Sequence, residues 1–187
     1  FFYDINGGIS IMSELRTNRI VPRDGLPSGS SGGIIQLKSV THTEFESQAL
    51  TGSGNFFDIP GMSVTITPTR ADSKILIDYR VSWMHTSSNG ATASLRLLRG
   101  STVIGNDATT DDRMGILLLS LGSTQNMSNS SINYLDSPAT TSAITYKMQI
   151  HLDGSGGSGG HIFGINHYPP NDNYRGTSSI TAYEVSG

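Results

Sequence analysis

The stretch "KILIDYRVSW", residues 74–83, limits the fold of this chain more than any other. Apolar and polar side chains alternate through it, which is the period of a β-strand with one buried face. The apolar positions that share this face are Ile75, Ile77, Tyr79, Val81 and Trp83. The pattern therefore predicts a half-buried strand in a sheet that is covered on one side.

Similar alternation in "MSVTIT" (62–67) and "AITYKMQIHL" (143–152) predicts further strands. "ASLRLLRGSTVIG" (93–105) predicts a strand with a tight turn at residues 99–101, and "SSITAYEV" (178–185) a last short strand. "NFFDIPGM" (55–62) predicts a short edge strand that leads into a turn, because proline cannot donate to a ladder.

The composition agrees with sheet, since glycine is frequent, at 22 residues, and charged residues make up only 14%. No segment shows sustained helical periodicity. We expect an all-β fold, an antiparallel β-sandwich or jelly roll of roughly eight to ten strands that follows an extended N-terminal arm.

The arm is predicted over residues 1–33 and the β-sandwich domain over residues 34–187. Pro22 and Pro27 block a helix, and a Gly/Ser tether ends the arm. Its apolar residues are too sparse for a core and are candidates for anchoring the chain on another surface: Leu15, Ile20, Val21 and Leu26. Met12 resembles a natural start, so residues 1–11 are either a processed remnant or sequence from upstream.

"MGILLLSLG", residues 114–122, is apolar on both faces, as expected for a strand that is covered from both sides. In a chain of this size, a neighbouring subunit could supply the second cover. The candidate interface residues are Ile116, Leu117, Leu118, Leu119 and Leu121.

The patterns of common catalytic and metal sites are missing from the sequence. His161 and His167 lie six apart, Asp107, Asp111 and Asp112 lack the spacing of an EF-hand loop, and no serine sits in a G-x-S-x-G elbow. Glu44 and Glu46 would share a face of a strand, where solvated carboxylates are commonplace. We expect no enzyme activity, no catalytic residue, no metal and no cofactor.

The net charge of −3 gives no reason to expect nucleic acid as a partner. No apolar run approaches the roughly 20 residues of a membrane span, so no membrane insertion is expected. The chain has no cysteine, so its robustness has to come from packing or from association of subunits.

The glycine-rich run "HLDGSGGSGGHIF", residues 151–163, could be a domain linker, a phosphate-binding loop or a loop between strands. A P-loop needs Gly-Lys-Ser/Thr before a helix, which is missing here. The residues after the run contain too few apolar positions to fold alone. We therefore expect a loop that joins two strands of one sheet.

Several blocks in order resemble a β-rich domain of fibre-like virion proteins of tailed bacteriophages. They are "F.DIPGMSVTITPTRADSKILI", "LRLLRGSTVIG", "DSPATTSAITYKMQ" and "SSITAYEV", and together they cover roughly residues 34–187. The arm "MSELRTNRIVPRDGLPSGS" resembles the N-terminal pieces of short phage fibre proteins. The resemblance implies a β-sandwich that forms a homotrimer on the surface of the virion and has no catalytic residues to transfer.

The sequence leaves three candidate functions. The first is a trimeric fibre-type protein that other virion proteins hold by its arm and that attaches to a host-surface glycan or protein. Its candidate contact residues are His161, His167, Tyr168 and Tyr174. The second is a capsid decoration protein with the same fold. The third, a polysaccharide hydrolase, is disfavoured because no paired carboxylates occupy an identifiable cleft segment.

Overall fold

The computed structural model describes residues 33–50, 56–86, 91–106, 116–121, 127–153, 161–167 and 175–186. For residues 48–50, 85–86, 91–92, 117–121, 152–153 and 161–163 it describes the backbone alone. The chain divides into two units, Phe1–Ser30 and Ser31–Gly187. The first unit lies outside the described residues, and so do the four predicted anchoring residues Leu15, Ile20, Val21 and Leu26.

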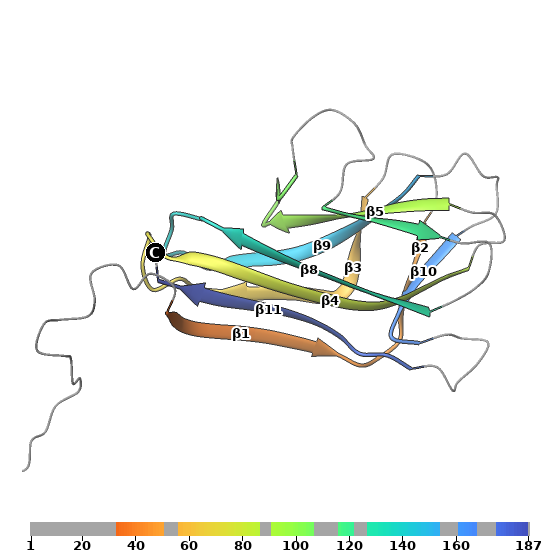
Figure 1. Ribbon diagram of the computed structural model, residues 1–187, viewed down its shortest axis with the longest axis horizontal. Coiled ribbons are helices and arrows are strands. Elements are labelled where there is room, and N and C mark those ends of the chain that lie inside the picture. Colours follow the sequence, from red (N-terminus) through yellow and green to blue (C-terminus); the bar gives the residue numbers. More distant parts are fainter. Residues whose placement is uncertain are drawn as a thin grey trace, which may run out of the picture. The chain divides into compact units, whose positions relative to one another are not determined.

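The described part of the chain folds into antiparallel strands and contains no helix (Figure 1). The strands are β1 (Ile34–His42), β2 (Glu46–Leu50), β3 (Phe56–Ile66), β4 (Lys74–Thr86), β5 (Ala91–Arg99), β6 (Thr102–Ile104), β7 (Leu117–Leu121), β8 (Met127–Asp136), β9 (Ile144–Asp153), β10 (His161–Ile165) and β11 (Ser178–Val185). The predicted all-β class is confirmed.

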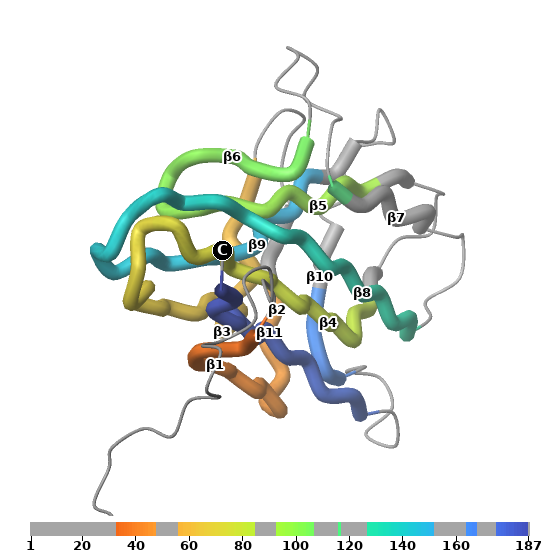
Figure 2. The backbone as a smooth tube through the Cα atoms, turned by 60° about the vertical axis from the view of Figure 1, so that its left-hand side comes forward, coloured from red at the N-terminus to blue at the C-terminus, as the bar shows by residue number. Residues whose placement is uncertain are grey.

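The first sheet is built around β4, the longest strand described. One edge of β4 pairs with β8, and its other edge pairs first with β11 and then with β10. Beyond them, β1 pairs with β11, and β2 pairs with β10. Figures 1 and 2 show β1 beside β11, although these strands come from opposite ends of the described chain. The sheet therefore has four strand positions. Two of these positions hold interrupted strands, one made of β1 and β2 and the other of β11 and β10.

The second sheet has the order β3, β9, β5 and then β6 together with β7, which pair with successive parts of β5. When β1 with β2, β6 with β7, and β10 with β11 are each counted as one interrupted strand, the two sheets contain eight strands. If these eight are numbered along the chain, the first sheet has the order first–eighth–third–sixth. The second sheet has the order second–seventh–fourth–fifth. Two four-stranded antiparallel sheets of eight strands are the architecture of a jelly roll. The predicted β-sandwich is thus confirmed, and the strand order selects its jelly-roll form.

The core lies between the two sheets and consists of the predicted alternating positions. All five residues named for the stretch 74–83 are buried, as are Met62, Val64 and Ile66 of β3. Ile144, Tyr146, Met148 and Ile150 of β9 are buried as well. The hydrophobic effect therefore sets the facing of these strands, because a slip by one residue would expose the whole set.

Three details differ from the sequence-based expectations. "NFFDIPGM" is an edge strand but leads into no turn: β3 continues past Pro60, and a bulge with Gly61 at φ 70° absorbs the irregularity. The glycine-rich run connects β9 of one sheet to β10 of the other, not two strands of one sheet. The strand β8 was not predicted, because Ser128 and Ser130 precede Ile132 and Tyr134 on its inner face and leave the apolar alternation too short.

Two buried carboxylates complete the hydrogen bonding where the core meets its turns. Glu184 accepts bonds from Gln36 Nε2 at 2.6 Å, from Thr69 N at 2.7 Å and from Thr69 Oγ1 at 2.8 Å. Burial by itself raises the pKa of Glu184, but these bonds outweigh burial and lower the pKa to about 2. Glu184 is therefore a charged group that fastens the turn between β3 and β4.

Asp136 plays the same part at the end of β8. It accepts two bonds from Arg99 Nη1, at 3.0 and 3.1 Å, and one from the hydroxyl of Tyr146 at 2.6 Å. Burial, reinforced by this bond to the carboxylate, raises the pKa of Tyr146. The three side chains join β5, β8 and β9, which belong to different sheets.

Candidate functional site: the base of an inserted loop and the hollow beside it

The interruption between β10 and β11 inserts a loop into the middle of a strand. Ile165 pairs with Glu46, and the next pair in the ladder is Ser178 with His42. Twelve residues, 166–177, therefore separate the two pairs on this strand, while only residues 43–45 separate them on the partner strand. An antiparallel bridge between His167 and Arg175 closes the base of the excursion. The predicted contact residues Tyr168 and Tyr174 fall between the two bridge residues in the sequence, outside the described residues.

Asn166 holds the base of the loop together with hydrogen bonds to three segments, residues 42–44, 82 and 176–178. Its Nδ2 donates to the carbonyls of His42 at 2.8 Å and Glu44 at 3.0 Å, and its Oδ1 accepts from Ser178 Oγ at 2.6 Å. Its backbone N–H donates to Ser82 O at 2.9 Å, and its carbonyl accepts from Gly176 N at 2.8 Å. All hydrogen-bonding groups of this fully buried residue are thus engaged.

The conformation of Asn166 explains why asparagine stands there. Its φ is 67°, a left-handed conformation that asparagine tolerates better than most residues with a side chain. Glycine would adopt it more readily but could not bridge the two carbonyls of residues 42 and 44. Asparagine is therefore the residue that meets both requirements.

Close packing on both sides of Asn166 fixes the neighbouring segments. A Cβ at Gly176 would overlap the side chain of Ser82, and a Cβ at Gly164 would lie 2.8 Å from Phe45 Cε2. Phe45 in turn meets the ring of His167 edge to face, with the ring centres 5.5 Å apart. The base is thus a tightly packed joint, and both ends of the loop leave from fixed positions.

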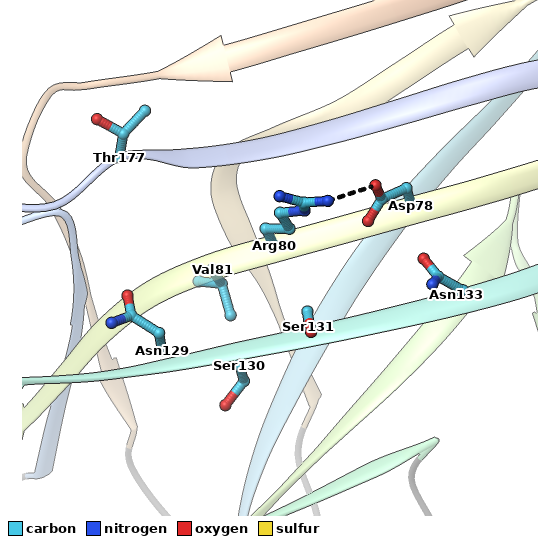
Figure 3. A pocket seen from close by; sticks show the side chains of 8 residues that line it. All are labelled: Asp78, Arg80, Val81, Asn129, Ser130, Ser131, Asn133 and Thr177. Carbon is cyan, nitrogen blue, oxygen red and sulfur yellow. Dashed lines mark hydrogen bonds and ion pairs between the residues drawn. The ribbon is translucent and has the colours of Figure 1, made fainter.

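A polar hollow of about 380 Å³ lies beside this base on the outer face of the first sheet (Figure 3). Side chains of β4 and β8 form it, and Thr177, which follows the loop, closes one end. The lining residues are Asp78, Arg80, Val81, Asn129, Ser130, Ser131, Asn133 and Thr177. Thr177 lies between Gly176 and Ser178 of the loop base, so the hollow adjoins this base.

Seven of the eight residues that line the hollow have side chains that can form hydrogen bonds, and Val81 is the exception. Arg80 Nη2 contacts Asp78 Oδ2 at 3.3 Å, and the Asn133 amide, turned with its nitrogen toward Asp78, donates to Asp78 Oδ1 at 3.2 Å. The hydroxyl and amide groups around this pair can bind a polar ligand such as a glycan or a peptide through hydrogen bonds. The described residues include no group of three or more His, Asp or Glu side chains able to hold a metal ion.

The structure brings together few of the residues that the sequence singled out. His167 lies at the loop base, whereas His161 belongs to β10 and its side chain is not described. Glu44 lies in the connection between β1 and β2, not on a strand beside Glu46. Asp107, Asp111 and Asp112 fall outside the described ranges.

The predicted interface strand is present as β7, which pairs with β5. Ile116, just before it, packs against the core of its own subunit, and the side chains of Leu117, Leu118, Leu119 and Leu121 are not described. The role of this strand in an interface stays a prediction.

Sequence reasoning missed Asn166, Gly176 and Ser178. An Asn next to a glycine-rich segment is a weak signal for a left-handed conformation, and many loops contain one. The partners of Asn166 come from residues 42–44, 82 and 176–178, which are far apart in the sequence. No local pattern could have revealed this joint.

No helix in the described part of the chain is long and apolar enough to cross a membrane. No protein-family model matches the sequence, and no curated protein matches it. Among solved structures, the chain is similar to the Gx strain of infectious bursal disease virus, with 18% identity over 88% of this chain and 42% of that chain and a TM-score of 0.40.

Two further similarities are of the same kind. The VP2 subviral particle of infectious bursal disease virus shows 13% identity over 81% of this chain and 38% of that chain, with a TM-score of 0.37. The Gt strain of this virus shows 14% identity over 95% of this chain and 43% of that chain, with a TM-score of 0.34. The chain thus spans about two fifths of the length of the chains it matches.

Proposed function

We propose that this chain is a non-enzymatic structural protein of a bacteriophage particle, a homotrimeric fibre-type protein. Its N-terminal arm holds it on other virion proteins, and its jelly roll presents the loop of residues 168–174 to a host-surface glycan or protein. The observation that carries this proposal is the joint around Asn166. A long insertion interrupts one strand of the sheet, and all hydrogen-bonding groups of Asn166 at its base are paired. This construction suits the presentation of the inserted segment to a binding partner.

The physical argument is one of preorganisation. A binding loop loses less conformational entropy on contact with its target when its ends are already fixed. The joint fixes both ends at His167 and Arg175, and the polar hollow extends the surface with hydroxyl and amide groups. Binding residues are often found on loops that a rigid scaffold positions, and this region has that construction.

The test exchanges residues 168–174 for a Gly/Ser segment of the same length and leaves Asn166, His167 and Arg175 in place. Virions that carry the exchanged protein should adsorb to host cells more slowly while their content of this protein stays the same. A matched control replaces the exposed turn residues Thr141 and Ser142, which lie between β8 and β9, with alanine. Adsorption that is unchanged by the loop exchange would contradict the role in attachment.

The second candidate function is capsid decoration. It is favoured by the described part of the chain, which forms one sandwich and no elongated shaft such as a long tail fibre needs. Antibody labelling of intact virions separates the two functions, since a fibre-type protein should label tails and a decoration protein heads. Capsids that lose heat stability without the protein would support decoration.

The absence of enzyme activity is a separate part of the proposal. Purified protein should leave the polysaccharides of the host surface intact when the products are examined by size-exclusion chromatography. Cleavage that persists through repeated purification would contradict this part, and the hollow at Asp78 would then be the first place to search for its source.

A further inference from the structure

The polar hollow beside the loop base is surrounded by side chains of the outer face of the first sheet. Val81 faces the core, and the hydroxyl of Ser130 accepts a hydrogen bond from Trp83 Nε1 at 2.9 Å. Figure 3 shows the side chains of Val81 and Ser130 on the side of the sheet away from the others. The side chains that remain for a ligand are those of Asp78, Arg80, Asn129, Ser131, Asn133 and Thr177.

The register of β4 and β8 brings most of these polar groups together. Asp78 is the ladder partner of Asn133, and Arg80 is the ladder partner of Ser131. Asn129 follows on the same face, because side chains two residues apart on a strand point to the same side. Ladder partners lie about 5 Å apart, and successive outward positions of one strand lie about 7 Å apart. Groups at these spacings can contact one small ligand at several points.

The two charges of the hollow balance each other. Arg80 Nη2 donates to Asp78 Oδ2 at 3.3 Å, and the other described lining residues carry no charge. An anionic ligand drawn to Arg80 would also approach the carboxylate of Asp78. A cationic ligand drawn to Asp78 would likewise approach the guanidinium. Because a like charge opposes binding in both cases, the hollow favours an uncharged ligand.

Donors and acceptors both remain available in the hollow. A guanidinium has five N–H donors and a carboxylate about four acceptor positions, and the contacts among Asp78, Arg80 and Asn133 use only some of them. The side chains of Ser131, Asn129 and Thr177 form no hydrogen bond within the described part of the chain. Sugar hydroxyls both donate and accept, so they match such a mixed surface.

A peptide fits this hollow less well than a sugar does. Peptides gain affinity by pairing with a sheet edge or by placing apolar side chains in pockets. The hollow lies on the face of the sheet, and none of the described side chains that face it is apolar. It therefore offers a peptide neither kind of contact.

We infer that the polar hollow is a binding site for an uncharged sugar residue of a glycan. In naming a glycan as the partner, this site rests on the proposed function, to which it adds the place of contact and the charge of the ligand. Its volume of about 380 Å³ is in the range of small-molecule sites. Arg80 and Asn133 hold Asp78 from two sides, so this carboxylate loses little freedom when a ligand binds. The described lining residues include no aromatic ring for stacking, so we expect a dissociation constant of about 1 mM or higher.

The first experiment measures saturation-transfer NMR from the full chain to methyl glycosides at about 5 mM, a concentration suited to weak binding. The neutral glycosides are those of glucose, galactose, mannose and N-acetylglucosamine, and the charged ones are those of glucuronic acid and glucosamine. At least one neutral glycoside should bind more tightly than both charged ones. Ser131→Ala and Asn129→Ala should each weaken its binding about threefold or more. Thr41→Ala changes an exposed residue of the same face that does not line the hollow, so it should leave binding unchanged.

A wild-type chain that binds none of the neutral glycosides would overturn the inference. Binding of a capped, uncharged Ser-Gly-Ser peptide in the absence of glycoside binding would also overturn it, in favour of a peptide ligand. Glycoside binding that both alanine variants in the hollow leave intact would place the sugar elsewhere and contradict the site.

A second experiment changes the charge of the hollow. Asp78→Asn leaves Arg80 without its counter-charge, and this variant should prefer the glucuronic acid glycoside to the neutral one. Arg80→Gln leaves Asp78 alone and should shift the preference to the glucosamine glycoside. Thermal unfolding verifies that both variants are folded. Ligand preferences that stay the same in both folded variants would contradict binding in the hollow.

The site and the role in attachment can fail separately, because the variants in the hollow keep residues 168–174 and the loop exchange keeps the hollow. Variants in the hollow that no longer bind the glycoside but leave virion adsorption normal would support the site and contradict its use in attachment. If the loop exchange slows adsorption while the variants in the hollow bind glycosides as the wild type does, the proposed function stands and this inference is overturned.

Discussion

Ser178 Oγ donates a hydrogen bond of 2.6 Å to Asn166 Oδ1 across the base of the inserted loop. The same hydroxyl accepts a bond of 3.0 Å from the backbone N–H of Ser82 on β4. Ser178 therefore links the two ends of the excursion to the central strand of the sheet. Because both side chains are buried, a mutation that removes one hydrogen-bond partner in this joint would leave the other group without a partner and without water to replace it.

The first prediction concerns Asn166. Asn166→Ala removes three side-chain hydrogen bonds. It also leaves a Cβ at positive φ with no hydrogen bonds to offset the strain, so it should lower the free energy of unfolding by about 3 kcal/mol. Asn166→Gly loses the same bonds but tolerates the conformation, so its loss should be about 1 kcal/mol smaller. Urea unfolding at one fixed protein concentration measures both. Equal losses would show that the backbone at this position is not strained.

The second prediction concerns the close approach of Gly176 to Ser82. Gly176→Ala forces a methyl group onto the Ser82 side chain and should lower the free energy of unfolding by about 2 kcal/mol. Ser82→Gly in the same chain should restore part of this loss by vacating the space. Gly33→Ala is the matched control, since a Cβ there meets nothing within 4 Å. A Gly176→Ala variant as stable as the control would contradict the packing of this joint.

The third prediction compares two buried tyrosines. The hydroxyl of Tyr79 has no hydrogen-bond partner among the described residues, and burial raises the pKa of this residue. Tyr79→Phe should therefore leave stability unchanged or raise it by up to about 1 kcal/mol. Tyr146→Phe removes the bond to Asp136 and should cost about 2 kcal/mol. Thermal unfolding should show a higher melting temperature for Tyr79→Phe than for Tyr146→Phe.

The fourth prediction is a pH dependence. The pKa of Glu184 is lowered to about 2 in the folded chain, so its charge stabilises the fold above the ordinary pKa of 4.5 and this contribution is lost as pH falls from 4.5 toward 2. The shift corresponds to about 3 kcal/mol. Glu184→Gln should be less stable than the wild type at pH 7, and the difference should shrink steadily below pH 4.5.

Urea unfolding at several pH values measures this difference. Asp72→Asn is the control, because this carboxylate is exposed and pairs with the exposed Arg70, so its removal should matter little at any pH. A Glu184→Gln variant whose deficit stays constant from pH 7 to pH 2.5 would contradict the assignment.

The fold class was predictable because strand alternation reports burial directly. Residues 75–83 show apolar side chains at every second position, and each of them is buried in the sandwich. The strand β8 was not predictable in this way, because its inner face includes Ser128 and Ser130 and its outer face Asn129 and Ser131. Its place is set by the ladder it forms with β4, and backbone hydrogen bonds leave no signature in the sequence.

The sequence by itself determined that the chain forms β-strands and which face of most strands is buried, since a period of two and the hydrophobic effect act within each segment. The tertiary structure decided which strands are neighbours. Only this pairing places Asn133 and Ser131 beside Asp78 and Arg80 in the hollow, and only it places Asn166 within reach of His42, Ser82 and Ser178. Both features join residues that are remote in the sequence, and their physical cause is the register of the sheet.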